Sequence, residues 1–312
     1  MKKHILRFSN NTGDAQLTVY SVFPGAEITF HSIHMDELSW EDEASDGRAA
    51  ALPKEQSHLL EIHHCREGRI EQAFDDTFFY LMPGDLSVAK RQSMVKAYRF
   101  PLRHYHGITV GIDLMHLSED FRKMLSEIGV DPAQIACKLC GDRSCFIVRA
   151  ETNIEHILSE LYTAPEALRE GYIKLKILEL LLILSHTEIT RDHSSACALP
   201  QSQVLLAHQA AAYLAENRKR HVTVQELSRQ MGISPTQLKA IFRGVYGQPV
   251  FTYMRTQRMQ EAAQLLIHTD RPIGEIAEMS GYTNASKFAS AFQAIMGETP
   301  REFRQAHTQQ RK

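Results

Sequence analysis

"GISPTQLKAIFRGVYG", residues 232–247, returns in altered form as "GYTNASKFASAFQAIMG", residues 281–297. Both copies belong to a longer shared pattern. It consists of a helix, a tight turn at a glycine, a second helix that ends at a glycine, and a proline that begins the next helix. The matched positions are Gly232 with Gly281, Phe242 with Phe292, Gly247 with Gly297 and Pro249 with Pro300. The repetition predicts a helix-turn-helix that one chain builds twice.

Capping residues mark the helix starts of this region. A Ser or Thr followed three positions later by Glu or Gln satisfies the first unpaired backbone N–H groups of a helix. Such pairs occur at Thr223/Glu226, Ser234/Gln237 and Thr299/Glu302. Apolar residues recur behind them at helical spacing, and we predict that they form the core of the two copies: Leu227, Met231, Leu238, Ile241, Phe242, Ile276, Met279, Phe288, Ala291 and Phe292.

The second helix of each copy leaves small, polar and basic residues outside this core. Residues of these types on a protruding helix suit a DNA major groove, where base edges and phosphates both lie within reach. The helix expected over 249–269 would be about 30 Å long, close to one DNA turn of about 34–36 Å. We therefore predict contacts with two successive grooves from Thr236, Gln237, Lys239, Ala240 and Arg243, and from Asn284, Ala285, Ser286, Lys287 and Ser290.

The charge of the chain is unevenly distributed. Residues 204–312 carry 14 Lys and Arg against 8 Asp and Glu, whereas the preceding residues carry 21 against 29. A basic module on an acidic body suggests polyanion binding by the C-terminal part. The N-terminal sequence lacks the apolar run of a signal peptide, and "ILELLLILS" (177–185) is too short to span a bilayer. We expect a cytoplasmic protein without membrane contact.

The motifs of the repeat region also carry a family resemblance. "ELSRQMGISPTQLKAIFR", "YMRTQRMQEAAQLL" and "IGEIAEMSGYTNASKFASAFQAIMGETPREFR" make residues 204–307 resemble the DNA-binding domain of the AraC/XylS family of bacterial transcription regulators. The resemblance implies an all-helical domain bound to promoter DNA, with RNA polymerase a candidate partner. It places base contacts at Thr236, Lys239, Ala240, Ala285, Ser286 and Ser290, and phosphate contacts at Arg243 and Lys287.

The N-terminal part has the sequence pattern of β-strands and not of helices. Short β-rich runs separated by Gly and Asp fill residues 1–116 and predict a small barrel or sandwich. "CREGRIEQAFDDTFFYLMPGDLSV" (65–88) and "YIKLKILELLLIL" (172–184) resemble, less specifically, the sensor half of the same family. That resemblance implies a cupin-like barrel with a small-molecule effector inside, followed by helices that join a homodimer.

The predicted fold is thus α+β in two domains. A cupin-like effector-binding and dimerisation domain covers 1–189, a polar linker covers 190–203, and an all-α double helix-turn-helix domain covers 204–312. The helix that follows Pro165 is apolar almost all round, so it must be covered on two sides. We predict that its own barrel covers one side and a partner chain the other, through Tyr172, Leu175, Leu178 and Leu182; the alternative is a fully buried internal helix.

Histidines in the predicted barrel suggest an effector pocket. We propose His31, His63, His64, Tyr80, His104 and His106 as its lining. A catalytic cupin needs a further histidine just past its Pro-Gly turn, and "LSVAKR" after "MPGD" (82–85) has none. We therefore predict no metal, no cofactor and no catalytic residue, and hence a regulator that is not an enzyme. A cupin-type metalloenzyme with an appended DNA-binding module is the alternative.

Three cysteines form a second cluster, "CKLCGDRSC" at 137–145. The CxxC spacing of Cys137 and Cys140 suits zinc or a redox pair, but a closed zinc site needs a fourth ligand and no second CxxC exists. We interpret Cys137, Cys140 and Cys145 as structural thiols. A thiol-sensing or metal-sensing regulator is the alternative.

Overall fold

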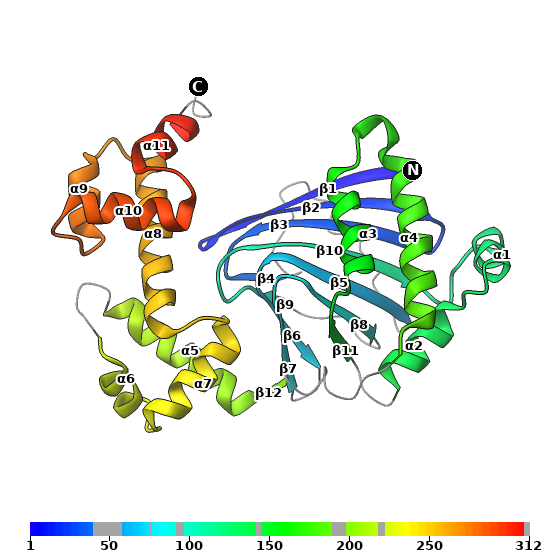
Figure 1. Cartoon of the computed structure of the whole chain (residues 1–312), viewed down its shortest axis with the longest axis horizontal. Coiled ribbons are helices and arrows are strands. Elements are labelled where there is room, and N and C mark those ends of the chain that lie inside the picture. The colour runs from blue at the N-terminus through cyan, green and yellow to red at the C-terminus, as the bar shows by residue number, and fades with distance from the viewer. Residues whose placement is uncertain are drawn as a thin grey trace. The chain divides into compact units, whose positions relative to one another are not determined.

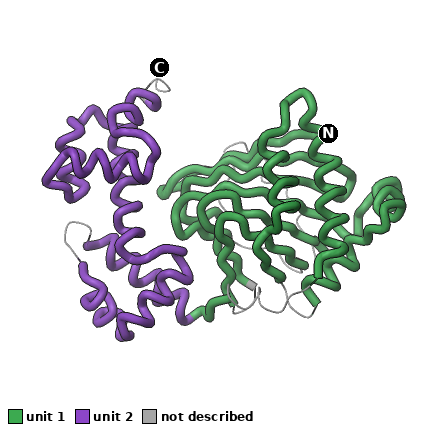
Figure 2. Tube along the Cα trace, in the orientation of Figure 1, with its two compact units in different colours: residues 1–201 green, residues 202–312 purple. Residues whose placement is uncertain are grey.

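A computed structural model describes most of the chain, namely residues 1–39, 58–74, 77–91, 97–141, 145–188, 198–217 and 222–308. It divides into two compact units, Met1–Gln201 (unit 1) and Ser202–Lys312 (unit 2), which Figure 2 colours separately. No helix within these described ranges is long and apolar enough to cross a membrane.

Unit 1 is built on two antiparallel sheets (Figure 1). The larger has the strand order β1 (Lys2–Asn10), β2 (Gly13–Phe23), β3 (Ala26–His34), β10 (Tyr105–Asp113), β5 (Leu59–Gly68), β8 (Asp85–Arg91) and β11 (Cys145–Arg149). The smaller has the order β12 (Ala198–Pro200), β7 (Thr77–Leu81), β6 (Ile70–Phe74), β9 (Ala97–Arg99) and β4 (Glu37–Ser39). Over the described residues the strands thus form two sheets and not the closed barrel that we predicted.

The larger sheet separates two cores, because successive side chains of a strand point to opposite faces. On one face, residues such as Leu60 and Ile62 pack with four helices in what we call the helix-side core. On the other face, residues such as Ile33 and Cys65 pack against the smaller sheet in the inter-sheet core. The four helices are α1 (Glu119–Glu127), α2 (Pro132–Cys140), α3 (Thr152–Thr163) and α4 (Arg169–His186).

Helix α4 has one face inside the unit and an apolar stripe outside it. Its buried residues belong to the helix-side core and are Ile173, Ile177, Leu180, Leu181 and Leu184. On the opposite face the exposed fractions are 66% for Leu175 and 38% for Leu182, and Leu168, the residue just before the helix, is 57% exposed. Of the other two predicted dimerisation residues, Tyr172 is half-buried and Leu178 packs against the helix-side core. The helix is therefore covered on one side by its own unit and is not fully buried.

Unit 2 consists of helices throughout its described part. They are α5 (Gln201–Glu216), α6 (Val224–Gln230), α7 (Pro235–Tyr246), α8 (Val250–His268), α9 (Ile273–Met279), α10 (Ala285–Met296) and α11 (Pro300–Thr308). The pairs α6–α7 and α9–α10 are the two predicted helix-turn-helix copies, and α8 joins them (Figure 1).

The predicted turns and caps of unit 2 are present. Gly232 and Gly281 have φ values of +69° and +81° at the two turns, a left-handed conformation that glycine adopts without steric cost. Ser234 and Gln237 form a reciprocal capping box. The Thr223 hydroxyl accepts a hydrogen bond from the Glu226 N–H at 3.1 Å, whereas the Glu226 carboxylate accepts one from the Tyr213 hydroxyl at 3.2 Å.

Two core predictions in unit 2 were wrong in detail, and one boundary differs. Met279 is 51% exposed because α9 ends there, and Tyr282 packs against this core after the turn. Met231 is half-buried because it caps the end of α6. Of the predicted linker, residues 190–197 lie outside the described residues, whereas Ala198–Pro200 pairs with β7 and α5 begins at Gln201.

Candidate nucleic-acid interface

Helices α7 and α10 each bury one face and expose the other. The buried residues are Leu238, Ile241, Phe242, Val245 and Tyr246 in α7, and Phe288, Ala291 and Phe292 in α10. All ten residues that we predicted as DNA contacts are exposed: Thr236, Gln237, Lys239, Ala240, Arg243, Asn284, Ala285, Ser286, Lys287 and Ser290. The periodicity that predicted the core therefore also predicted which face is open to a ligand.

Two of these ten side chains already stabilise the helix starts. The Gln237 Oε1 atom accepts hydrogen bonds from the backbone N–H and the hydroxyl of Ser234, at 3.2 and 3.0 Å. The Asn284 Oδ1 atom accepts from the backbone N–H groups of Ser286 and Lys287, at 2.9 and 3.1 Å. Base readout through these two oxygens would have to compete with the caps, so we assign Gln237 and Asn284 mainly a positioning role.

The first turn of each exposed helix suits a close approach of DNA phosphate. Small side chains stand there, at Thr236 in α7 and at Ala285 and Ser286 in α10. The caps already bind the N–H groups of Gln237, Ser286 and Lys287, so attraction for an anion here comes mainly from the helix dipole. The ammonium groups of Lys239 and Lys287 lie within two turns of these termini and add formal positive charge.

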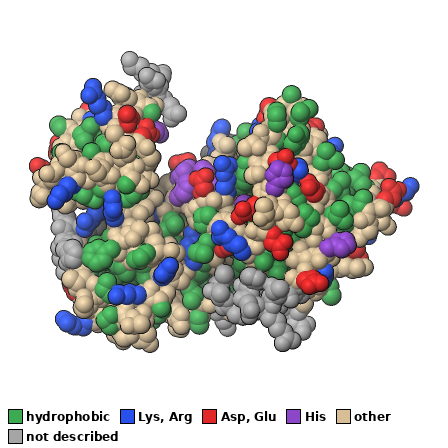
Figure 3. All heavy atoms as spheres, in the orientation of Figure 1, with side chains coloured by type: hydrophobic (Ala, Val, Ile, Leu, Met, Phe, Trp, Pro, Cys, Tyr) green, Lys and Arg blue, Asp and Glu red, His purple; other side chains and the backbone are tan. Residues whose placement is uncertain are grey.

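Helix α8 holds the two copies together. It has 19 residues, which corresponds to a length of about 28 Å, and it contacts α7, α9, α10 and α11. The Arg258 guanidinium lies 3.6 Å from the position that a Cβ at Gly281 would occupy, so it packs on the turn of the second copy. Arg255 on the same helix is exposed. Figure 3 shows Lys and Arg side chains spread over the visible face of unit 2.

Residues 227–306 match a family described as a helix-turn-helix domain. The xylose operon regulatory protein of Escherichia coli is 28% identical over 101 residues, which are 32% of this chain and 26% of that protein. The transcriptional regulator AlkR of Acinetobacter baylyi is 27% identical over 170 residues, 49% of this chain and 55% of AlkR. The C-terminus of the chain is an AraC-type DNA-binding domain.

The likeness to known proteins is concentrated in this AraC-type domain. The chain spans about a quarter of the length of the xylose regulator and about half of AlkR. Among solved structures, the C-terminal domain of AraT, a response regulator from Geobacillus stearothermophilus, is 28% identical. The alignment covers 32% of this chain and 84% of that domain, with a TM-score of 0.31.

Outside the AraC-type domain, the inter-sheet face of unit 1 holds a buried polar network. The Thr109 hydroxyl lies 2.8 Å from His31 Nε2 and 2.8 Å from His63 Nδ1, and His63 Nε2 lies 3.2 Å from a Glu61 carboxylate oxygen. The exposed fractions of His63 and Glu61 are only 2% and 8%. Glu61 and Thr109 were not predicted; the alternation of Glu61 and His63 along one strand is the signal that could have found them.

Burial keeps His31 on this face neutral. It lowers the pKa of His31 to about 3, and the neighbouring His63 adds to the effect. Burial, followed by the Glu61 carboxylate, raises the pKa of Glu27. On the same side of the sheet, the Tyr80 hydroxyl donates a hydrogen bond to Glu71, and two buried polar atoms, Gln72 Nε2 and the Tyr105 hydroxyl, have no hydrogen-bond partner among the residues that the structure describes.

The structure does not bring the six predicted effector residues together. His31, His63 and Tyr80 lie on the inter-sheet side. His64 points to the helix side, where burial, together with Arg149 and Arg66, lowers its pKa to about 4. His104 and His106 lie at one end of the larger sheet beside His34, and burial lowers the pKa of both. The six residues are divided in this way because one strand sends neighbouring side chains into different layers.

The predicted cysteine cluster is also divided. Cys140 belongs to the helix-side core and its thiol lies 3.5 Å from the Val88 carbonyl oxygen. Cys145 belongs to the inter-sheet core, and Cys137 is exposed. Thiols that face different layers of the fold cannot share one metal ion or one disulfide without rearrangement. The placement favours our interpretation of Cys140 and Cys145 as structural residues.

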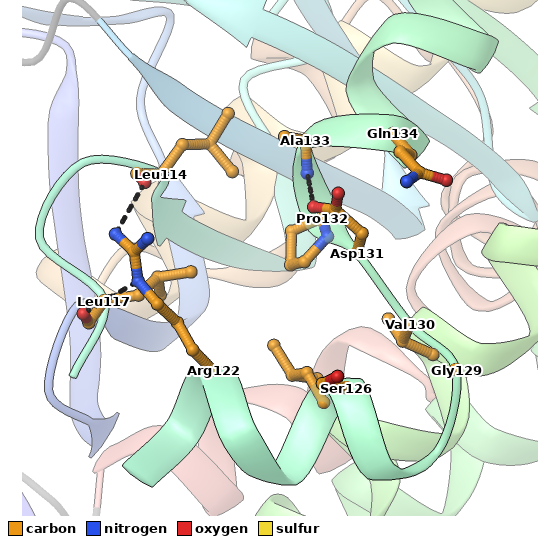
Figure 4. A pocket seen from close by; sticks show the side chains of 11 residues that line it. Leu114, Leu117, Arg122, Ser126, Gly129, Val130, Asp131, Pro132, Ala133 and Gln134 are labelled. Carbon is orange, nitrogen blue, oxygen red and sulfur yellow. Dashed lines mark hydrogen bonds between the residues drawn. The ribbon is translucent and has the colours of Figure 1, made fainter. Parts of the chain in front are cut away.

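A pocket of about 460 Å³ lies between α1, the start of α2 and the loop after β10 (Figure 4). Its two charged side chains already bind backbone groups. Arg122 donates to the carbonyl oxygens of Leu117 and Leu114 at 3.2 and 3.4 Å, and Asp131 accepts from the Ala133 N–H at 2.9 Å. These contacts hold the loop and the helix start in place.

Proposed function

We propose that the chain is a sequence-specific, double-stranded-DNA-binding transcription regulator. The observation that carries this proposal is the pair of capped helices α7 and α10, each with a small, polar and basic face exposed, joined by a helix close to one DNA turn in length. Each helix would enter one of two successive major grooves. The curated relatives are transcription regulators, which supports the same reading.

In this proposal Gln237 and Asn284 cap their helices, and the other eight exposed residues contact DNA in two ways. Base edges would be read by Thr236, Lys239, Ala240, Ala285, Ser286 and Ser290, and the five short side chains among them favour apolar, shape-based or water-assisted readout over bidentate hydrogen bonds. Arg243 and Lys287 would contact phosphate, which fixes the register of the protein without reading sequence.

Replacing Lys287 with alanine should weaken binding to every DNA sequence by a similar factor. Removal of one phosphate contact should lower the slope of log affinity against log salt concentration by about 0.9. The measurement is the dissociation constant for an operator and for a random duplex at several salt concentrations. Lys138→Ala, in unit 1, is the control: its ammonium group donates to the Ser185 carbonyl oxygen and should leave both slopes unchanged. A loss confined to one base position would contradict the phosphate assignment.

We further propose that a small-molecule effector binds between the two sheets of unit 1. Unpaired buried polar groups are costly, and Gln72 Nε2 and the Tyr105 hydroxyl have no hydrogen-bond partner among the described residues. The ring centroid of Tyr105 lies 5.9 Å from that of His31, and Gln72 accepts a hydrogen bond from Ser87, which is paired with His63. A small molecule rich in hydrogen-bond donors and acceptors would satisfy these groups.

A polar metabolite that binds there should raise the melting temperature of the full-length chain. At one hundred times its dissociation constant the ligand would add about 2.7 kcal/mol to the free energy of unfolding. His63→Leu should abolish the shift, whereas Arg122→Ala, at the separate pocket beside α1, should keep it. A screen in which the active metabolites also stabilise His63→Leu would contradict this site.

The exposed apolar stripe of α4 supports a third proposal, a homodimer. Leu175 and Leu182 are seven residues apart, so they lie on one side of α4 two turns apart, and Leu168 stands seven residues before Leu175, immediately ahead of the helix. A second copy of the same stripe would cover them in a two-fold interface.

A further inference from the structure

Three histidines meet at one end of the larger sheet, away from the inter-sheet network. They are His34 at the end of β3, His104 just before β10 and His106 within β10. One ring nitrogen from each lies within 4.8 Å of the other two. The ring centroids of His104 and His106 are 4.8 Å apart, and those of His34 lie 5.3 and 5.5 Å from them.

The sheet register brings these side chains together. Strand β10 lies between β3 and β5 (Figure 1), and His106 is paired with Ser32 on one side and with Glu67 on the other. Side chains repeat every second residue on one face of a strand, so His34 lies on the same face as Ser32. His34, His106 and Glu67 therefore come from three adjacent strands.

The backbone before β10 is shaped so that His104 joins them. A Cβ at Gly68 would lie 1.9 Å from the His104 carbonyl oxygen, so only glycine allows the two chains to approach this closely. Arg103 is the one non-glycine residue with positive φ, +56°, in the part of the chain that the structure describes. Such a conformation is unfavourable for a side chain with Cβ and persists only where the surroundings enforce it.

Glu67 adds a carboxylate to the three imidazoles. One of its oxygens lies 3.5 Å from His104 Nε2 and 3.9 Å from His106 Nδ1. The other ring nitrogen of His106, Nε2, lies 3.4 Å from the Ser32 hydroxyl. A hydrogen bond from Nε2–H to Ser32 would leave the Nδ1 lone pair directed to the side of Glu67, as in metal sites where an outer partner fixes the imidazole tautomer.

We propose that His34, His104, His106 and Glu67 form a binding site for a divalent transition metal of the zinc class. Imidazole and carboxylate are ligands that Zn²⁺ accepts in four-coordinate sites, with bonds of about 2.0–2.2 Å. Ligand atoms of a tetrahedral ion with such bonds lie about 3.4 Å apart, so the contacts of Glu67 need to shorten by up to about half an ångström, and the histidine nitrogens, which lie within 4.8 Å of one another, need to move closer by rotation of their side chains. Side chains that are one-third to one-half exposed leave an entry path for the ion.

A metal at this position would link β3, β10 and β5. It lies on the other face of the larger sheet from His31 and His63, so it would be an input separate from a small-molecule effector. It is also separate from the cysteines, because no thiol belongs to the group.

The test measures zinc binding by the full-length chain, purified without a histidine tag and stripped with a chelator. After dialysis against Zn²⁺, mass spectrometry of the metal content should find one ion per chain. His34→Gln, His106→Gln and Glu67→Gln should each weaken binding at least about tenfold. The Co²⁺-loaded protein should show visible d–d bands without the near-ultraviolet charge-transfer band of thiolate ligands.

Two control variants mark other candidate ligands. His116→Gln removes an exposed histidine whose Nδ1 lies 2.8 Å from Asp113, and Cys137→Ser removes the exposed thiol; both should keep full zinc binding. Circular dichroism checks that each variant is folded. If a histidine variant unfolds, zinc binding by Glu67→Gln decides whether the site exists. Wild-type protein without zinc, zinc retained in all three cluster variants, or a thiolate band in the cobalt spectrum would overturn the site.

Discussion

Replacing Leu175 with glutamate should convert the full-length chain from a dimer of twice 35.5 kDa into a monomer. Leu175 is 66% exposed at the centre of the α4 stripe, between Leu168 and Leu182. Burial of a leucine side chain contributes about 1.5–3 kcal/mol when it is complete. A two-fold interface loses this contribution twice and gains two carboxylates that face each other. Sedimentation velocity measures the mass directly.

The same variant tests what the dimer does for DNA binding. Two linked DNA-binding domains on adjacent half-sites gain affinity of about 10²–10⁴ over one domain. Leu175→Glu should lose this gain on a double site and keep the affinity for a single half-site. Met115→Glu is the matched control, since Met115 is 60% exposed in unit 1 but lies outside α4. A wild-type mass of one chain, or a dimer that survives the substitution, refutes the interface.

The repeat in unit 2 could be predicted nearly completely, because its information is local. Helix caps, turn glycines and a 3.6-residue period each act within a few residues, and Ser234, Gly232 and Phe242 occupy the predicted positions. The exception, Met279, depends on where α9 ends and on Tyr282 packing in its place, which the period alone does not specify.

The sheets of unit 1 could be predicted only as a set of strands. Which strands are neighbours depends on long-range pairing, such as β10 between β3 and β5, and a single sequence carries little signal for it. That pairing places His106 beside Glu67, whereas the separation of His63 from His64 is local, because successive side chains of one strand face opposite sides. The candidate sites of unit 1 follow from register, so the sequence supplied some members, such as His63 and His106, but neither grouped them nor identified Glu61, Thr109 and Glu67.

Lowering the pH from 7 to 5 should destabilise unit 1 by several kcal/mol. Burial holds the pKa of His31 at about 3 and that of His64 at about 4, whereas both titrate near 6.5 in the unfolded chain. Below pH 6.5 the unfolded chain therefore binds protons that the folded unit does not, and the free energy of unfolding falls as the pH falls. Each group contributes about 2 kcal/mol between pH 7 and pH 5.

Other buried groups act in the opposite direction. Burial raises the pKa of Glu27 and of Asp85. A carboxyl with a raised folded pKa takes up its proton earlier in the folded state than in the unfolded chain, which adds stability as the pH falls. This uptake is confined to acidic pH, where carboxyls titrate, so it offsets part of the histidine effect near pH 5 and little of it near pH 6.

Hydrogen exchange of peptides from β3, β5 and β10 reports the opening free energy of this sheet at each pH. His31→Gln and His64→Gln should each flatten its fall between pH 6.5 and pH 5, and together they should remove the part that these two groups contribute, while His104 and His106, whose pKa burial also lowers, keep theirs. Ile28→Val is the control, because it removes a methyl group from a fully buried side chain in the same sheet. That change costs about 0.5–1.5 kcal/mol at every pH and leaves the slope as it is. A slope that the two histidine substitutions do not change would show that the protons are bound elsewhere in the chain.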